Sequence, residues 1–136
     1  MRYTVIAQGA TADSSVVSNT FNVQVNFAPI CSFELMHNAY LVAKESNLSV
    51  HVGNVLSSDR FYNEELDKQK LADYGVLAVE MEAAGLYLLA AKYNRKALAL
   101  STISDHILTG EETTAEEREN TFDDMMLVAL ESILYS

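Results

Sequence analysis

The chain has 136 residues, of which 49% are hydrophobic and 21% are charged, with five glycines and one proline. This composition predicts a single globular domain over residues 1–136 and excludes collagen-like, low-complexity and disordered chains. Nineteen acidic residues against nine basic residues give a formal net charge of −10, which disfavours nucleic acid and anionic membranes as partners.

Cysteine content and hydropathy bear on the compartment. Cys31 is the only cysteine, so no disulfide can form within the chain. Residues 1–9 lack the apolar stretch of a signal peptide, and charged side chains interrupt the most apolar stretch, residues 76–93. We therefore expect a cytoplasmic protein.

Two strands are predicted in the first part of the chain. One covers residues 3–7, and the other covers residues 21–27, where four apolar side chains alternate with Asn and Gln at a period of two. Three further elements follow: a helix over residues 35–45, a strand over residues 49–56 and a short helix over residues 64–74 that ends at Gly75.

Residues 76–103 have the strand, helix, strand order of a parallel crossover. The predicted strands cover residues 76–79 and 97–103, and the helix between them covers residues 82–94. This order places the chain in the α/β class.

The last predicted helix begins near Thr114, which forms a possible capping box with Glu117. Apolar side chains then recur at the spacing of an amphipathic helix, and we expect this stripe to face the core. The stripe consists of Phe122, Met125, Met126, Ala129, Leu130, Ile133 and Leu134.

Two carboxylates flank a thioether, in the order Glu80, Met81, Glu82, where the predicted strand over residues 76–79 ends. Ligands collect at the carboxyl ends of parallel strands. Two carboxylates one residue apart can accept hydrogen bonds from the vicinal hydroxyls of a sugar. Acidic side chains at a helix N-terminus also complement the helix dipole, and from the pattern alone this structural role is the more frequent one.

A second polar cluster, Ser104-Asp105-His106, follows the predicted strand over residues 97–103. Alone it equally describes a turn and gives no indication of acyl-transfer geometry. Arg118 lies thirteen residues after Asp105. A cation beside Asp105 would favour its ionised form, so a proton-donor role requires that the two pair only with substrate or on proton transfer. A solvated Arg118 paired with acidic neighbours is the open alternative.

Phe61 lies on a polar loop after the strand over residues 49–56, where it can cover a planar ligand or anchor the loop on the core, which is the more frequent role. The three histidines show no metal-ligand spacing with one another or with Cys31, so no metal site is expected. Neither common type of glycine-rich phosphate loop is present.

Three motifs together resemble the bacterial, hexamer-forming purine nucleoside phosphorylases, and the resemblance extends over essentially the whole chain. They are Val79-Glu80-Met81-Glu82-Ala83-Ala84, Ser104-Asp105-His106-Ile107 with Thr109, and Thr113-Thr114-Ala115-Glu116-Glu117-Arg118 followed by Thr121-Phe122. The resemblance implies a single mixed β-sheet flanked by helices. It also implies a homo-hexamer that binds purine nucleoside and inorganic phosphate as co-substrates, without cofactor or metal.

The implied reaction is reversible phosphorolysis of purine (deoxy)ribonucleosides to free base and (deoxy)ribose 1-phosphate. By the same resemblance, Asp105 would be the general acid that protonates the purine at N7, and Arg118 would swing toward it. The implied substrate-binding residues are Glu80, Met81 and Glu82 at the ribose, and Ser104, Val79 and Phe61 at the base.

The resemblance departs at the start of the chain. Family members have a substantial portion before the position that matches Met1, and it carries a glycine-rich turn and phosphate-binding arginines. The chain therefore resembles the C-terminal half or somewhat more of such an enzyme. We expect it to be a poor phosphorylase alone, because phosphate would be neither bound nor oriented, and to leave a sheet edge that favours association.

Three alternatives remain open. A related nucleosidase would use water, but Arg118 accompanies Asp105 in the phosphorylase pattern. A uridine phosphorylase would need a Gln paired with Arg to recognise uracil, and the loop around Phe61 has none. A non-catalytic purine-binding or assembly fragment is the alternative of another class.

Overall fold

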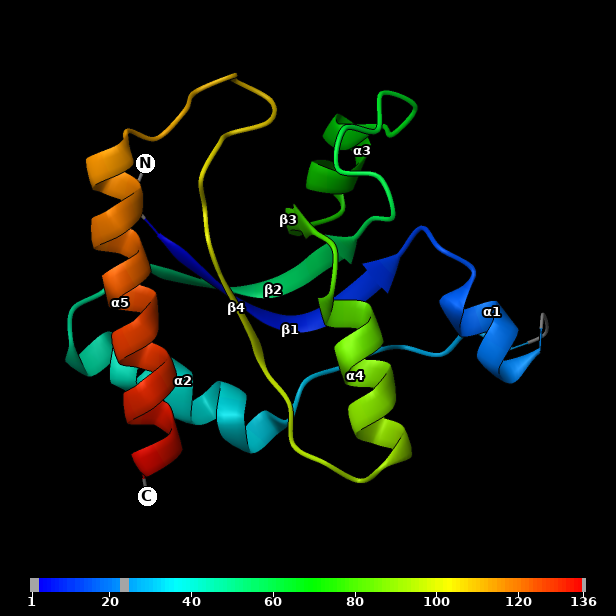
Figure 1. Cartoon of the computed structure of the whole chain (residues 1–136), viewed down its shortest axis with the longest axis horizontal. Helices are drawn as coiled ribbons and strands as arrows, with labels where there is room; N and C mark the ends of the chain where they lie inside the picture. Colours follow the sequence, from blue (N-terminus) through cyan, green and yellow to red (C-terminus); the bar gives the residue numbers. More distant parts are fainter. Residues whose placement is uncertain (1–2, 23–24, 136) are drawn as a thin grey trace.

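Two parallel strands, β1 (Thr4–Ala12) and β2 (Val50–Ser57), form the centre of the sheet. The computed structural model describes residues 3–22 and 25–135 (Figure 1). β3 (Val76–Glu80) pairs parallel to β2, and β4 (Ala99–Thr102) pairs antiparallel to β1, which gives the order β3-β2-β1-β4. The expected single mixed sheet is confirmed.

Helices cover both faces of this sheet because β1 buries side chains on both of its sides. On one face, Ile6 packs with residues of α2 (Phe33–Glu45) and with Val128 of α5 (Ala115–Leu134). On the other face, Val5 and Ala7 pack against α4 (Ala83–Lys92). A strand buried on both faces has a continuous apolar run in place of an alternating pattern.

Tyr87 joins α4 to two strands. Its side chain is 1% exposed. Its hydroxyl donates to the carbonyl of Ala7 in β1 and accepts from the amide of Ala99 in β4 at 2.9 Å. Burial raises the pKa of Tyr87 to about 12.

The strand predicted over residues 21–27 is wrong. Phe21 ends a short helix, α1 (Val16–Phe21), and residues 25–27 form no strand, while residues 23 and 24 lie outside the described residues. Six residues of extended chain would span roughly 20 Å, yet the rings of Phe21 and Phe27 stack with centroids 4.8 Å apart. Phe21 and Phe27 are therefore much closer than an extended strand between them would allow.

The parallel crossover predicted over residues 76–103 is also wrong. β4 runs antiparallel to β1 and therefore opposite to β3, which lies at the far edge of the sheet. The entry to β4 is held by the amide of Ser32, which donates to the carbonyl of Ala97 at 2.9 Å, and by the Tyr87 hydroxyl. Strand periodicity carries no information on direction, whereas these contacts place β4 beside β1.

The helix predicted over residues 64–74 is shorter than expected. α3 covers Lys68–Asp73, because the Asp67 carboxylate accepts from the amide of Lys70 and caps the helix there. The residues before Asp67 form a turn, in which the Asn63 side chain accepts from the amide of Glu65 at 3.1 Å.

The apolar stripe predicted as the core face of α5 is mostly exposed. The exposed members are Phe122, Met126, Leu130, Ile133 and Leu134, whereas Thr121, Val128 and Ser132 are buried. α5 contacts α2 and β4 over a narrow face, and the periodicity of a helix shows that a face exists without showing what covers it. The Thr114 capping box is confirmed.

Candidate active site

A cleft with a volume of about 720 Å³ lies between β3 with α3 on one side and the segment after β4 on the other. In Figure 1 this segment rises from β4 into an arch that leads to α5, with α3 across from it. The lining residues are Tyr3, Phe61, Tyr62, Lys68, Leu71, Ala72, residues 76–82, residues 101–108, Gly110 and Glu112.

Seven of the eight site residues expected from the sequence line this cleft. They are Phe61, Val79, Glu80, Met81, Glu82, Ser104 and Asp105. β3 and β4 run in opposite directions, so their carboxyl ends lie at opposite ends of the strands. A shared carboxyl edge therefore does not explain why the two polar clusters line the same cleft. Both clusters line the cleft because the segment after β4 forms the wall opposite β3.

Asp105 is held by short pairing between residues 104–106 and 111–113. Asp105 and Glu112 form an antiparallel bridge, and the amide of Thr113 donates to the carbonyl of Ser104 at 2.9 Å. The Ser104 hydroxyl donates to the Asp105 carboxylate at 3.0 Å. The Asp105 carboxyl is therefore exposed to the cleft on an ordered wall.

Arg118, the eighth expected site residue, is outside the lining of the cleft. It lies in the first turns of α5, and its guanidinium donates to the carbonyl of Thr113 at 3.0 Å. Because Thr113 also bonds to Ser104, Arg118 is linked to the wall that carries Asp105. Within the described part of the chain its guanidinium makes no hydrogen bond or ion pair with the Asp105 carboxylate.

The two carboxylates around Met81 have different surroundings. Glu80 is bonded to the Ser57 hydroxyl, and it accepts from the amides of Glu82 and Ala83, each at 2.7 Å. The Glu82 side chain is exposed and makes no hydrogen bond or ion pair within residues 3–22 and 25–135. One carboxylate therefore caps α4, and the other faces the cleft.

The loop that carries Phe61 is anchored by Asp13, which sequence reasoning missed. The Asp13 carboxylate accepts from the Ser58 hydroxyl at 2.6 Å and from the amide of Asp59 at 2.9 Å. The hydrogen bond from Ser58, followed by that from Asp59, lowers the pKa of Asp13. An acidic residue after β1 was the only available signal. Phe61 is 52% exposed, so its ring is available to a ligand.

The charge of the cleft is predominantly negative. Four carboxylates line it, from Glu80, Glu82, Asp105 and Glu112, whereas Lys68 is the one lysine or arginine in the lining formed by the described residues. Such a site favours a neutral ligand or a ligand that develops positive charge, and it offers little to an anion.

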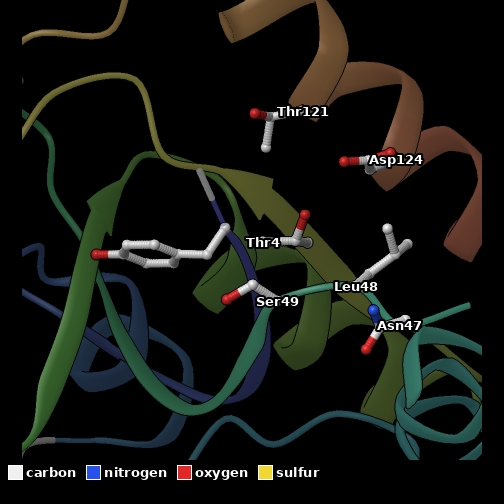
Figure 2. Close-up of a pocket in the computed structure, with 7 residues that line it drawn as sticks. Thr4, Asn47, Leu48, Ser49, Thr121 and Asp124 are labelled. Atoms are coloured by element: carbon white, nitrogen blue, oxygen red, sulfur yellow. The ribbon is translucent and has the colours of Figure 1, made fainter. Parts of the chain in front are cut away.

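A second hollow of about 330 Å³ lies between the start of β1, the turn before β2 and α5 (Figure 2). Its lining residues are Tyr3, Thr4, Asn47, Leu48, Ser49, Thr121 and Asp124. None of the expected site residues lines it. The Thr121 hydroxyl already donates within α5, to the carbonyl of Glu117 at 2.7 Å.

No helix within residues 3–22 and 25–135 is long and apolar enough to cross a bilayer. Within the same ranges, no group of three or more His, Cys, Asp or Glu side chains is arranged to hold a metal ion.

Comparisons with known proteins agree with the motifs. The chain is 60% identical over 134 residues to a protein of Listeria welshimeri named purine nucleoside phosphorylase DeoD-type. The alignment covers 98% of this chain and 57% of that protein. It is 55% identical over 132 residues to the protein of the same name from Latilactobacillus sakei, with 97% of this chain and 56% of that protein covered. The chain thus spans little more than half the length of these relatives.

The fold matches a solved structure. Purine nucleoside phosphorylase from Toxoplasma gondii, in complex with immucillin-H, aligns with a TM-score of 0.81 over 97% of this chain and 55% of that chain, at 17% identity. This match shows a shared fold. The model of the family described as Phosphorylase superfamily matches residues 3–133, which confirms the resemblance that the three motifs indicated. The chain belongs to the phosphorylase superfamily.

Proposed function

We propose that the chain forms the nucleoside-binding side of a purine nucleoside phosphorylase. This enzyme catalyses the reversible phosphorolysis of purine (deoxy)ribonucleosides to free base and (deoxy)ribose 1-phosphate. The observation that carries the proposal is the single cleft that contains both the Asp105 wall and the carboxylates around Met81. The names of the relatives in Listeria and Latilactobacillus support it.

In the proposed mechanism the purine lies against Phe61 and is bordered by Val79 and Ser104, because an exposed aromatic ring stacks on a planar base. Asp105, in its protonated form, donates its proton to N7 of the purine. The bond between C1′ and N9 then breaks with both electrons passing to the base, and an oxygen of phosphate bonds to C1′. Protonation turns the base into a good leaving group.

The ribose would lie at Met81 and Glu82. Positive charge develops on the sugar as the glycosidic bond breaks, and a nearby carboxylate stabilises that charge. The exposed Glu82 carboxylate can also accept hydrogen bonds from sugar hydroxyls, while the Met81 thioether contacts the apolar face of the ring.

Arg118 would act on Asp105 after a side-chain movement. In the ligand-free chain its guanidinium is bonded to the carbonyl of Thr113. We propose that it turns toward Asp105 as that residue gives up its proton, because the carboxylate that remains is then stabilised by the cation.

Phosphate would be the co-substrate, and no resident cofactor is proposed. Lys68 is the one lysine or arginine in the described cleft lining, so we propose that most phosphate-binding groups come from outside these 136 residues. A homo-hexamer in the cytoplasm is proposed from the family resemblance. The exposed apolar side chains of α5 support an assembled state.

The same shortage of cations favours a second candidate for the chain by itself, which is purine binding without phosphorolysis. An assay with inosine, with and without phosphate, separates the candidates. Phosphate-dependent ribose 1-phosphate identifies phosphorolysis, free ribose identifies hydrolysis, and saturable binding without either product identifies a binding fragment.

A further inference from the structure

The hydrogen bonds at the start of α4 assign different tasks to the two carboxylates around Met81. Three amides at this helix terminus have no partner within the helix and must be satisfied from elsewhere. Those of Glu82 and Ala83 donate to the Glu80 carboxylate, each at 2.7 Å, and that of Ala84 donates to the Ser57 hydroxyl at 2.9 Å. Both acceptors, the Glu80 carboxylate and the Ser57 hydroxyl, belong to residues before the helix.

Ser57 and Glu80 are also linked to each other. They are paired residues at the ends of β2 and β3, and the Ser57 hydroxyl donates to the Glu80 carboxylate. Ser57 is buried, so this pair is set by the sheet and not by a mobile loop. The start of α4 is therefore fixed directly to the carboxyl ends of two strands.

Glu82 occupies the residue before α4, where a side chain normally caps the helix. Its carboxylate makes no such bond, because Glu80 and Ser57 already satisfy the amides. The Glu82 backbone is held by two hydrogen bonds: its amide donates to the Glu80 carboxylate, and its carbonyl accepts from the amide of Leu86 at 3.0 Å. The Glu82 backbone is thus fixed, while its carboxylate lines the cleft without a hydrogen-bond partner among the described residues.

We propose that Glu80 is a positioning residue: it caps α4 and so fixes the backbone that keeps the Glu82 carboxylate free for the sugar hydroxyls. This inference rests on the proposed function and changes the role that the resemblance implies for Glu80. Capping requires hydrogen-bond acceptors, which a glutamine also supplies, whereas two sugar hydroxyls that both donate are best met by an acceptor-only carboxylate. The two roles therefore respond differently to the same substitution.

The capping part is tested on the ligand-free chain by amide hydrogen exchange at residues 82–84, measured by NMR. Glu80→Ala should accelerate exchange of the Glu82 and Ala83 amides about tenfold or more, since it removes bonds to a charged acceptor. Glu80→Gln should keep most of the protection, and Glu131→Gln, an exposed change on α5, serves as the control. Unprotected amides in the parent chain, or no change in Glu80→Ala, would overturn the capping role.

The sugar part is tested by dividing the dissociation constant of a 2′,3′-dideoxy purine nucleoside by that of the matching ribonucleoside, a ratio that exceeds one when the diol contributes to binding. A general disturbance of the fold weakens both ligands, so only a change in contact with the diol moves this ratio. Glu82→Gln should reduce the ratio about tenfold. Glu80→Ala should also reduce this ratio, because it loosens the backbone that carries Glu82, whereas Glu80→Gln should leave the ratio close to that of the parent chain.

Two results would overturn the division of roles: a ratio lost as completely in Glu80→Gln as in Glu82→Gln, or a ratio retained in Glu82→Gln. If the parent chain binds neither ligand, the proposed function fails and the sugar part fails with it. The exchange measurement still judges the cap in that case, so the two failures are distinguishable.

Discussion

The Tyr87 hydroxyl offers a sharp test of how the sheet is held together. Tyr87→Phe removes one oxygen and keeps the ring, which lies 1% exposed between α4 and the sheet. The lost oxygen donates to the carbonyl of Ala7 and accepts from the amide of Ala99. The substitution therefore leaves one acceptor in β1 and one donor in β4 without their side-chain partner.

The expected cost follows from these two groups. An unsatisfied buried polar group costs about 1–3 kcal/mol. Ala7 is fully buried, whereas Ala99 is half-buried and regains part of its loss from water. We expect the free energy of unfolding to fall by about 2–4 kcal/mol, a large share of the roughly 5–15 kcal/mol typical of a domain.

Urea unfolding followed by circular dichroism measures this difference directly. Tyr74→Phe is the matched control, because Tyr74 is 80% exposed and its substitution should stay within about 0.5 kcal/mol of the parent chain. A Tyr87→Phe chain as stable as the control would refute the claim that this hydroxyl joins β1 to β4.

Three further predictions follow. The folded-state pKa of Tyr87 is raised to about 12, so the folded chain keeps this proton to a higher pH than the unfolded chain does. The stability that the hydroxyl contributes is therefore complete below about pH 10 and lost by about pH 12. In urea titrations the stability difference between the parent chain and Tyr87→Phe should shrink over that range, and a constant difference would contradict the prediction. Asp105→Asn, assayed in a form of the protein that shows phosphorolysis, should slow cleavage of ordinary purine nucleosides about 100-fold or more but spare nucleosides whose base needs no protonation, and equal slowing would count against the acid role. Val128→Ala should lower the free energy of unfolding by about 2 kcal/mol, because Val128 is fully buried. Leu130 is 59% exposed, so Leu130→Ala should lower it by under about 0.5 kcal/mol. The reverse order in thermal melts would support the apolar stripe as the core face of α5.

The sequence predicts the presence of the core elements better than their relations. Apolar runs around Val5, Val52 and Ala78 mark β1, β2 and β3, and the capping box at Thr114 marks the start of α5. The direction of β4 could not be predicted, because it depends on the Tyr87 hydroxyl and on the bond between Ser32 and Ala97, which join residues far apart in sequence.

The exposed face of α5 was predicted as core for a related reason. A row of apolar side chains shows that the helix has an apolar face, and burial depends on whether a neighbour covers that face. Val128 lies on the face covered by α2 and β4, whereas Leu130 lies on the uncovered one. The described residues of the alternating segment, 21, 22 and 25–27, likewise pair with no strand of the sheet.

The sequence predicts most of the residues that later prove to line one cleft, but not the different surroundings of Glu80 and Glu82. The family resemblance implies that Asp105 and the pair around Met81 belong to one site, and all of them line that cleft. The split between Glu80 and Glu82 depends on Ser57, twenty-three residues before Glu80. Asp13, which anchors the Phe61 loop, carries no recognisable motif.

The most direct test of the central claim is to locate the purine nucleoside on the chain. Titration of the isotopically labelled protein with inosine, followed by backbone amide shifts, should give saturable changes at Phe61, Glu82 and Asp105. Saturable changes confined to the second hollow, around Ser49 and Thr121, or no saturable change at all, would contradict the assignment of the cleft as the nucleoside site.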